Sequence, residues 1–188
     1  MTKEDVNYFE LMIAGIGGQG ALIIGRLLAD AGMQKYTYVS YFPSYAMTMR
    51  GGGSQCTVIL SINEISAPAV LEPSSVILMD PSALDEFGKR IKSGGLLILD
   101  SSLVTQKVAR EDLRVIYLPA TRIATGLGNA QVANFILLGA YLEATKAVPM
   151  ELCESALDKK IASGKDKSLL LFDSQALREG ARLISEGK

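Results

Sequence analysis

The sequence contains no histidine and only two cysteines, Cys56 and Cys153, among its 188 residues. Without histidine, the chain has no imidazole for a general base, a catalytic triad or a histidine-ligated metal site. Iron–sulfur clusters are usually held by four cysteine thiolates, so two cysteines are not expected to hold one. We therefore expect no catalytic residue and no metal ligand in this chain alone.

The sequence also lacks an excess of charge and a long apolar run. Lys and Arg total 19 and Asp and Glu total 20, which gives a formal net charge of −1. Nucleic-acid-binding proteins usually have a basic excess, so no nucleic-acid partner is expected. The longest apolar runs are too short to span a bilayer, and the acidic N-terminal segment lacks a signal-peptide pattern. These absences predict a cytoplasmic protein with reduced thiols and no membrane partner.

Apolar runs alternate with helical patterns along the chain. Strands are predicted at residues 11–14, 36–42, 56–62, 76–79, 96–99 and 115–118, and helices at 20–33, 82–92, 129–147, 149–162 and 173–186. Pro43 is expected to end the second strand, and Ser82 to cap the following helix together with Asp85. Alternating apolar residues at 56–62 indicate an antiparallel hairpin or a sheet edge. Continuous apolar strands between helices predict an α/β fold with a mostly parallel sheet, helices on both faces and the C-terminal helices as a cap.

A glycine-rich segment, GIGGQG at residues 15–20, follows the first predicted strand and precedes the first predicted helix. This context is typical of a turn in which glycines let the backbone approach a ligand and helix N–H groups favour an anion. An alternative is that the glycines only let the helix and strand pack closely. A nicotinamide site also needs an acid after the second strand, but residues 31–62 contain no Asp or Glu. The turn therefore predicts a cradle for a phosphate or a partner backbone rather than an NAD site.

A second candidate site is the segment YFPSYAMTMRGGGS at residues 41–54. Because it follows the second strand, we expect it at the carboxyl edge of the sheet, beside the glycine turn. Arg50 offers a planar set of donors suited to phosphate or carboxylate. The aromatic residues and methionines of the segment indicate a buried interface or a ligand groove. The alternative is an ordinary hairpin in which Arg50 pairs with a neighbour. Cys56 is expected to be a small buried apolar residue.

Together, GIGGQG, FPSYAMTMRGGGSQCTVILS, ISAPAV and the downstream GLGNAQVANFILLGAYLEAT resemble the gamma subunit, or gamma domain, of 2-oxoacid:ferredoxin oxidoreductases. This family includes the pyruvate, 2-oxoglutarate and ketoisovalerate (branched-chain) enzymes, and the resemblance covers about residues 11–157. It implies a Rossmann-like α/β fold and a single gamma-type domain over residues 1–188. It also implies an accessory subunit of an enzyme that decarboxylates a 2-oxoacid oxidatively, forms an acyl-CoA and passes electrons to ferredoxin.

The resemblance further implies cofactor and partners. Thiamine diphosphate and iron–sulfur clusters are expected in partner subunits, namely alpha and beta subunits and a ferredoxin-like delta subunit, and this chain is expected to help form the coenzyme A site. The residues that match the two loops of the family are Gly15, Gly17, Gly18, Gln19, Gly20, Ser44, Tyr45, Arg50, Gly51 and Gly52. Ala46 and Thr48 depart from the loop, where the family commonly has Gly and Glu.

The sequence also indicates a subtype of the enzyme and leaves one alternative function open. The segment GSQC at residues 53–56 is closer to the 2-oxoglutarate and branched-chain enzymes than to the pyruvate enzymes. The alternative function is a stand-alone nucleotide-binding module that forms a homodimer.

Overall fold

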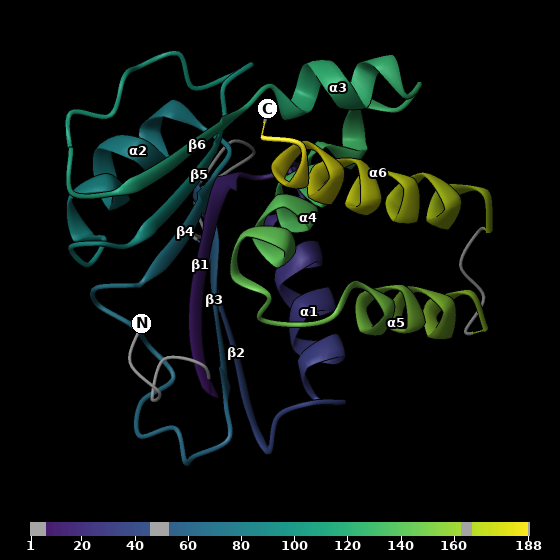
Figure 1. Cartoon of the computed structure of the whole chain (residues 1–188), viewed down its shortest axis with the longest axis horizontal. Coiled ribbons are helices and arrows are strands. Elements are labelled where there is room, and N and C mark those ends of the chain that lie inside the picture. Colours follow the sequence, from purple (N-terminus) through teal and green to yellow (C-terminus); the bar gives the residue numbers. More distant parts are fainter. Residues whose placement is uncertain (1–6, 46–52, 163–166, 188) are drawn as a thin grey trace.

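The computed structural model describes residues 7–45, 53–162 and 167–187. Within them, one sheet has the strand order β2-β3-β1-β4-β5-β6 (Figure 1). Its strands are β1 (Tyr8–Ile16), β2 (Tyr38–Tyr45), β3 (Gly53–Ser61), β4 (Ser75–Leu78), β5 (Leu96–Asp100) and β6 (Arg114–Leu118). The strands β1, β4, β5 and β6 pair in parallel, whereas β3 runs antiparallel to both β1 and β2. The predicted mostly parallel α/β sheet is confirmed.

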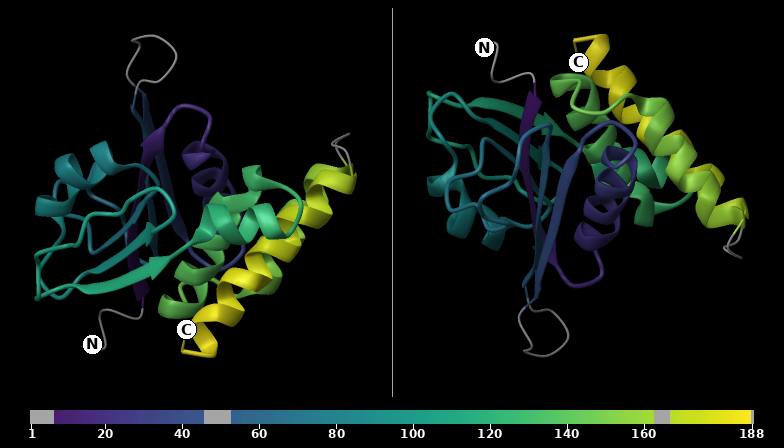
Figure 2. Two further views of the ribbon diagram at one scale, coloured as in Figure 1. Left: turned by 90° about the horizontal axis from the view of Figure 1, so that it is seen from above. Right: turned by 90° about the horizontal axis from the view of Figure 1, so that it is seen from below.

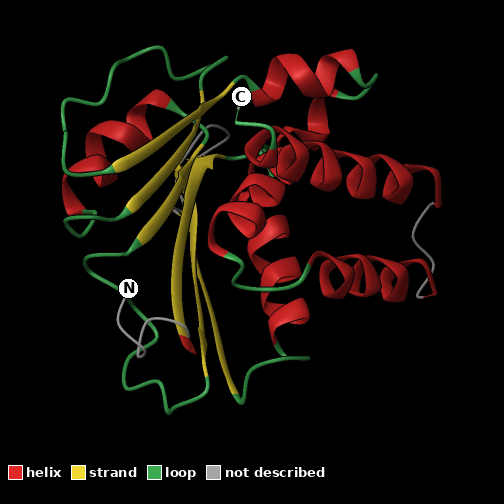
Figure 3. Ribbon diagram, in the orientation of Figure 1, coloured by secondary structure: helices red, strands yellow, loops and turns green. Residues whose placement is uncertain are grey.

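Helices cover both faces of this sheet (Figure 3). One face carries α2 (Pro81–Phe87) and the short η2 (Gly88–Arg90); the other carries α1 (Ala21–Gly32) and α4 (Ala133–Thr145). The remaining elements are α3 (Ala120–Gly126), η3 (Ala130–Val132), α5 (Met150–Ala162) and α6 (Lys167–Ser185). The two C-terminal helices pack outside α1 and α4 as an outer layer (Figure 2), which is the predicted cap. None of the described helices is long and apolar enough to cross a membrane.

The two faces of the sheet have separate apolar cores. Successive strand residues point to opposite faces, so Leu11 and Ile13 of β1 join the core under α1 and α4. Met12 and Ala14 join the core under α2. Because both sets are buried, the strand reads as a continuous apolar run, as parallel strands between two helical layers do.

The second strand differs from its prediction. Residues 36–42 were expected, but β2 runs from Tyr38 to Tyr45 and includes Pro43, which is paired with Cys56 of β3. Proline has no N–H to donate, yet β2 is the edge strand of the sheet and bonds on one side only. The prediction that Pro43 ends the strand was therefore wrong.

Segment 56–62 forms an antiparallel hairpin with β2, which was one of the two possibilities, and the other, a sheet edge, does not apply because β3 lies between β2 and β1. Two other expectations were wrong. The cap of α2 is Asp80, whose Oδ1 accepts from the N–H of Ser82 at 2.9 Å. The long helix predicted from residue 129 is divided into η3 and α4, and the seven-residue α3 was not predicted.

Candidate functional site

The glycine turn joins β1 to α1 at the carboxyl edge of the sheet. Gly18 has φ +98° and Gly20 has φ +78°, both in the left-handed region that favours glycine. Gly20 is the N-cap residue of α1, and no side chain caps the helix there. The turn thus leaves the positive end of the α1 dipole facing this edge.

The side chain of Gln19 fixes the turn from within. Its Oε1 accepts from the N–H of Ile16 at 2.9 Å, and its Nε2 donates to the carbonyl of Met79 at 2.8 Å. A Cβ on Gly15 would lie 2.3 Å from that Oε1, so Gly15 leaves room for the amide. The amide therefore ties the turn to the end of β4.

Asn134 fastens the turn to the start of α4. This buried side chain donates from Nδ2 to the carbonyl of Gly20 at 3.2 Å. A Cβ on Gly20 would lie 2.3 Å from Nδ2. Gly15 and Gly20 thus each leave room for a neighbouring side-chain amide, that of Gln19 and that of Asn134. The sequence signal for Asn134 was the segment GLGNAQVAN, which the resemblance singled out without assigning a role to that residue.

A first pocket, which we call the α4 pocket, lies between the glycine turn and the start of α4. It has a volume of about 210 Å³. Its lining includes Gly18, Gln19, Met79, Asp100, Thr121 and Asn134.

Asp100, at the end of β5, is the acidic residue of the α4 pocket, and its side chain is buried. Its Oδ2 accepts from the N–H of Thr121 at 3.1 Å and from Oγ1 of Thr121 at 2.6 Å, and its Oδ1 accepts from the N–H of Ser102 at 3.0 Å. Both carboxylate oxygens are therefore occupied by the protein itself. Asp100 thereby holds the end of β5 to the start of α3.

The second predicted loop adjoins the glycine turn through its last residues, Gly53 and Ser54, as expected. Gly53, at the start of β3, is directly opposite Ile16, and Gln55 is opposite Ala14. Ser44 of β2 is in turn opposite Gln55. The strand β3 returns between the first and second strands, so its beginning, rather than the end of β2, adjoins the turn.

Part of this loop falls outside the described residues. That part includes the predicted site residues Arg50, Gly51 and Gly52 and the two positions that depart from the family, Ala46 and Thr48. For Tyr45, only the backbone is described, as the last residue of β2.

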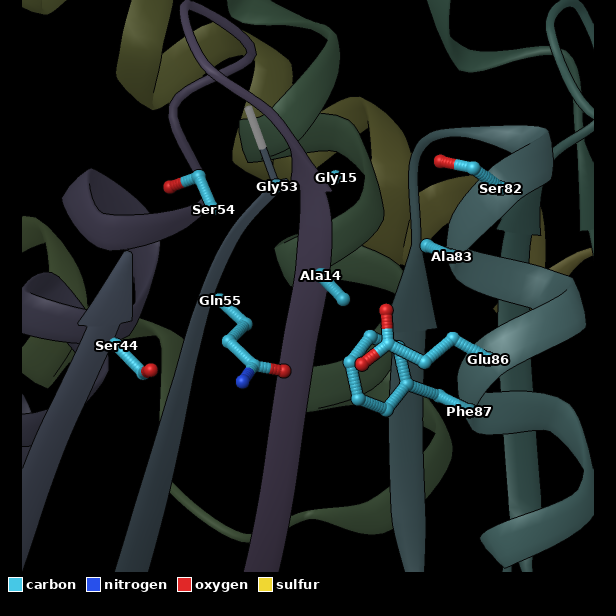
Figure 4. A pocket seen from close by; sticks show the side chains of 10 residues that line it. All are labelled: Ala14, Gly15, Ser44, Gly53, Ser54, Gln55, Ser82, Ala83, Glu86 and Phe87. Carbon is cyan, nitrogen blue, oxygen red and sulfur yellow. The ribbon is translucent and has the colours of Figure 1, made fainter. Parts of the chain in front are cut away.

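A second pocket, which we call the α2 pocket, opens on the other side of β1 (Figure 4). It has a volume of about 280 Å³, and its lining includes Gly15, Ser44, Gln55, Ser82, Glu86 and Phe87. The structure thus brings Gly15 of the first predicted loop and Ser44 of the second to one pocket. Gly18 and Gln19 line the α4 pocket instead, and Gly17 and Gly20 are not among the lining residues of either.

Sequence reasoning missed Gln55 and the contribution of α2 to this pocket. The rule that could have found Glu86 and Phe87 is geometric: β4 is parallel and adjacent to β1, so the segment after β4 must lie beside the segment after β1. Assigning that neighbour requires the strand order, which the sequence alone did not provide.

The two cysteines are buried and unpaired. Burial raises the pKa of Cys56 to about 12, so its thiol is not a nucleophile near neutral pH. Its Sγ lies against α1, where a Cβ on Gly25 would be 2.3 Å away. Cys56 is a small buried residue at a close helix–strand contact, as predicted. In the described parts of the chain, no group of three or more His, Cys, Asp or Glu residues could hold a metal ion.

Known proteins are similar to this chain over most of its length. The family model described as pyruvate ferredoxin/flavodoxin oxidoreductase matches residues 10–183. The 2-oxoglutarate synthase subunit KorC of Methanothermobacter marburgensis is 33% identical over 187 residues, with 95% of this chain and 98% of KorC covered. The ketoisovalerate oxidoreductase subunit VorA of the same organism is 34% identical over 177 residues, covering 90% of this chain. The chain spans only 35% of the length of VorA.

Two solved structures share the fold. The gamma subunit of a keto/oxoacid ferredoxin oxidoreductase from Geobacter sulfurreducens has a TM-score of 0.77 at 26% identity, covering 93% of this chain and 95% of that one. The 2-oxoglutarate:ferredoxin oxidoreductase from Magnetococcus marinus has a TM-score of 0.86 at 19% identity, covering 96% of this chain and 31% of that one. At that identity, the second likeness concerns the fold alone.

Proposed function

Since the chain belongs to the pyruvate ferredoxin/flavodoxin oxidoreductase family, as its two loops predict, we propose that it is the accessory gamma subunit of a multi-subunit 2-oxoacid:ferredoxin oxidoreductase. The complex decarboxylates a 2-oxoacid oxidatively, forms an acyl-CoA and passes electrons to ferredoxin. The observation that carries this proposal is the match to KorC over nearly the whole length of both chains. Residues 1–188 form one gamma-type domain, which is not catalytic alone.

The substrate is 2-oxoglutarate or a branched-chain 2-oxoacid rather than pyruvate. The relatives named for 2-oxoglutarate or for ketoisovalerate alone, such as KorC and VorA, are 33–34% identical to this chain. The common gamma subunit of pyruvate and ketoisovalerate oxidoreductases from Thermococcus litoralis is 29% identical over 155 residues. The segment GSQC at residues 53–56 favours the same subtypes.

Coenzyme A binds at the edge where the two loops meet. The Magnetococcus enzyme of the same fold was solved with 2-oxoglutarate, coenzyme A and succinyl-CoA bound. The start of α1 would favour the phosphates electrostatically, because helix N–H groups and the helix dipole attract anions. Arg50 would add a charge-assisted hydrogen bond, and Gly17, Gly51 and Gly52 would let the backbone approach the ligand.

The remaining cofactors belong to partner subunits. Thiamine diphosphate is held by the alpha and beta subunits, and iron–sulfur clusters by a ferredoxin-like delta subunit. This division of labour is consistent with a chain that has no histidine and only two cysteines, both buried. The gamma subunit then braces the catalytic subunits and helps to form the coenzyme A site.

The test is reconstitution. The chain is co-purified with the subunits encoded beside it, and coenzyme A-dependent oxidation of 2-oxoglutarate, ketoisovalerate and pyruvate is measured with and without it. We expect activity on one of the first two substrates to be lost when the chain is omitted. Full activity of the complex without this chain would contradict the proposal.

The alternative, a stand-alone nucleotide-binding homodimer, is favoured only by the glycine turn. Calorimetry of the isolated chain with NAD, FAD, ATP and coenzyme A separates the two functions. Tight binding of NAD or FAD by the isolated chain would support the alternative. Weak or no binding of both supports the subunit.

A further inference from the structure

The buried amide of Asn134 links the glycine turn to the helices behind it. Its Nδ2 donates to the carbonyl of Gly20 at 3.2 Å, and its Oδ1 accepts from the N–H of Phe135 at 3.0 Å. The residue is only 3% exposed, although it belongs to the wall of the α4 pocket. An amide that is buried and hydrogen-bonded in this way acts on the turn rather than on a ligand.

Gly20 is the residue through which Asn134 acts. It is the N-cap residue of α1, and its carbonyl also accepts from the N–H of Ile23 at 3.1 Å and from that of Ile24 at 3.2 Å. Its φ is +78°, and a Cβ at this position would overlap Nδ2 of Asn134. The first N–H groups of a helix have no partner within the helix, and the N-cap peptide sets their direction. The amide of Asn134 therefore fixes how α1 presents its N-terminus at the carboxyl edge of the sheet.

The first turn of α1 is held separately by the sheet. The hydroxyl of Tyr41, on β2, donates to the carbonyl of Leu22 at 3.0 Å. The Sγ of Cys56, on β3, donates to the carbonyl of Ala21 at 3.5 Å. These two bonds hold the helix against β2 and β3, whereas Asn134 holds the residue before the helix. The loss of the Asn134 amide should therefore loosen the turn while α1 stays in place.

The position of Asn134 is set by a close crossing of α4 and α6 (Figure 1). A Cβ on Gly180 of α6 would overlap the carbonyl oxygen of Ile136, and a Cβ on Gly139 of α4 would overlap that of Leu177. The backbones of the two helices are therefore in direct contact, and Ile136 is only two residues after Asn134. Because closely packed groups cannot shift without a clash, the C-terminal helix keeps the first turn of α4 in place.

We propose that Asn134 is a positioning residue for coenzyme A, which orients the glycine turn so that the N–H groups at the start of α1 meet a phosphate group of the ligand. This inference rests on the proposed function, which puts coenzyme A at this edge of the sheet. Without the amide of Asn134, the peptide of Gly20 is free to rotate, and part of the binding free energy is used to restore its orientation. The decarboxylation is assigned to other subunits, so the loss should appear in the KM for coenzyme A and not in kcat.

The first experiment tests the contact in the full chain without ligand. Hydrogen exchange of the Ile24 amide, which bonds to Gly20, is compared by NMR with that of Ile98 in β5. In Asn134→Ala we expect exchange at Ile24 to accelerate about fivefold more than at Ile98, since one local hydrogen bond is lost. Asn129→Ala is the matched control, because the side chain of Asn129 caps η3 in the same segment. Equal acceleration at both amides would show only a general loss of stability and would overturn the local role.

The second experiment measures the kinetics of the co-purified complex. Asn134→Ala should raise the KM for coenzyme A about fivefold, with kcat within about twofold of the wild type, and Asn129→Ala should change neither. If Asn134→Ala does not assemble, Asn134→Ser, whose side chain is shorter and lacks the amide, gives the same comparison. An unchanged KM, or a loss confined to kcat, would overturn the positioning role.

The two experiments separate this inference from the proposed function. Full activity of the complex without this chain would contradict the proposed function, and the kinetic comparison would then have no bearing on coenzyme A. Exchange at Ile24 involves neither ligand nor partner, so it still decides whether Asn134 holds the turn. Local acceleration at Ile24 together with an unchanged KM would show that the turn is held but does not bind coenzyme A.

Discussion

Two glutamines, one within the glycine turn and one beside it on β3, are used in opposite ways. Gln19, in the α4 pocket, satisfies both atoms of its amide by bonding to Ile16 and Met79. Gln55, in the α2 pocket, leaves its buried Oε1 without a donor. Both residues are glutamines and both lie near the same edge of the sheet, so the difference lies in what each amide contacts.

This contrast extends to the acidic residues of the two pockets. Asp100 is buried and accepts three hydrogen bonds from Thr121 and Ser102, whereas Glu86 is exposed and makes no ion pair within the described structure. The polar groups of the α4 pocket hold the fold together. In the α2 pocket, Ser82 bonds to the N-cap residue Asp80, whereas Oε1 of Gln55 has no donor within the described residues. Mutations should therefore reduce stability more on the first side than at Gln55.

The largest effect on this comparison is expected from Gly20→Ala. Its φ of +78° costs about 1–2 kcal/mol for a residue with a Cβ. The new Cβ would also displace the amide of Asn134, which lies 2.3 Å away, and the lost hydrogen bond adds about 1 kcal/mol. Urea denaturation should show a loss of about 2–3 kcal/mol in the free energy of unfolding.

Gly18→Ala is the control for that variant. Gly18 has a φ of +98°, but no atom lies within 4 Å of its Cβ position, so only the backbone cost applies. If Gly18→Ala destabilises the chain as much as Gly20→Ala does, the contact between Asn134 and the turn contributes nothing.

The next largest effect is expected from Asp100→Asn. An asparagine keeps one acceptor, but its NH2 group would face a donor from Thr121 or Ser102. Two buried donors that face each other without an acceptor should reduce the free energy of unfolding by about 1–3 kcal/mol. Thermal denaturation measures the loss. Asp112→Asn, at an acid that is 41% exposed, is the control and should shift the midpoint much less; equal shifts would contradict the assigned role of Asp100.

A smaller loss is expected from Gln19→Leu. The substitution removes two partly buried hydrogen bonds and leaves the N–H of Ile16 without its acceptor, at a cost of about 1–2 kcal/mol. Hydrogen exchange of the Ile16 amide should become faster as the turn loosens. Unchanged exchange and unchanged stability would mean that Gln19 does not fix the turn.

The smallest effect on stability, and one of different character, is expected from Gln55→Leu. Removing a buried oxygen that has no donor should leave the free energy of unfolding unchanged or raise it by up to about 1 kcal/mol. A loss of stability as large as that of Gln19→Leu would erase the contrast between the two pockets.

The sequence predicted most of the fold for identifiable reasons. Apolar runs such as those of β4 and β5 are buried on both faces, so they read as strands without ambiguity. The prediction failed where a local rule competed with tertiary context. Pro43 was read as a strand end, but an edge strand does not require its N–H. Asp80 and Ser82 both qualify as helix caps, and Pro81, which favours the first helical position, indicates Asp80, the cap that the structure shows.

The candidate site was predicted only in part. Glycines at 15–20 and the segment after the second strand indicated the right edge of the sheet, because turns after parallel strands meet there. Gln55 and Glu86 carried no sequence signal, since a glutamine in a strand and a glutamate on an exposed helix are ordinary residues. They become notable only when the pairing of β3 with β1 and the packing of α2 place them in one pocket.

By itself, the sequence determined the α/β class, the glycine turn, the family and the absence of histidine. These properties depend on residue type and local periodicity, which are visible directly in the sequence. Only the tertiary structure decided that β3 lies beside β1. It also decided that both polar atoms of the Gln19 amide are hydrogen-bonded, whereas Oε1 of Gln55 has no donor within the described residues. Whether a polar atom is satisfied depends on neighbours far apart in the chain, and those neighbours are set by strand order and helix packing.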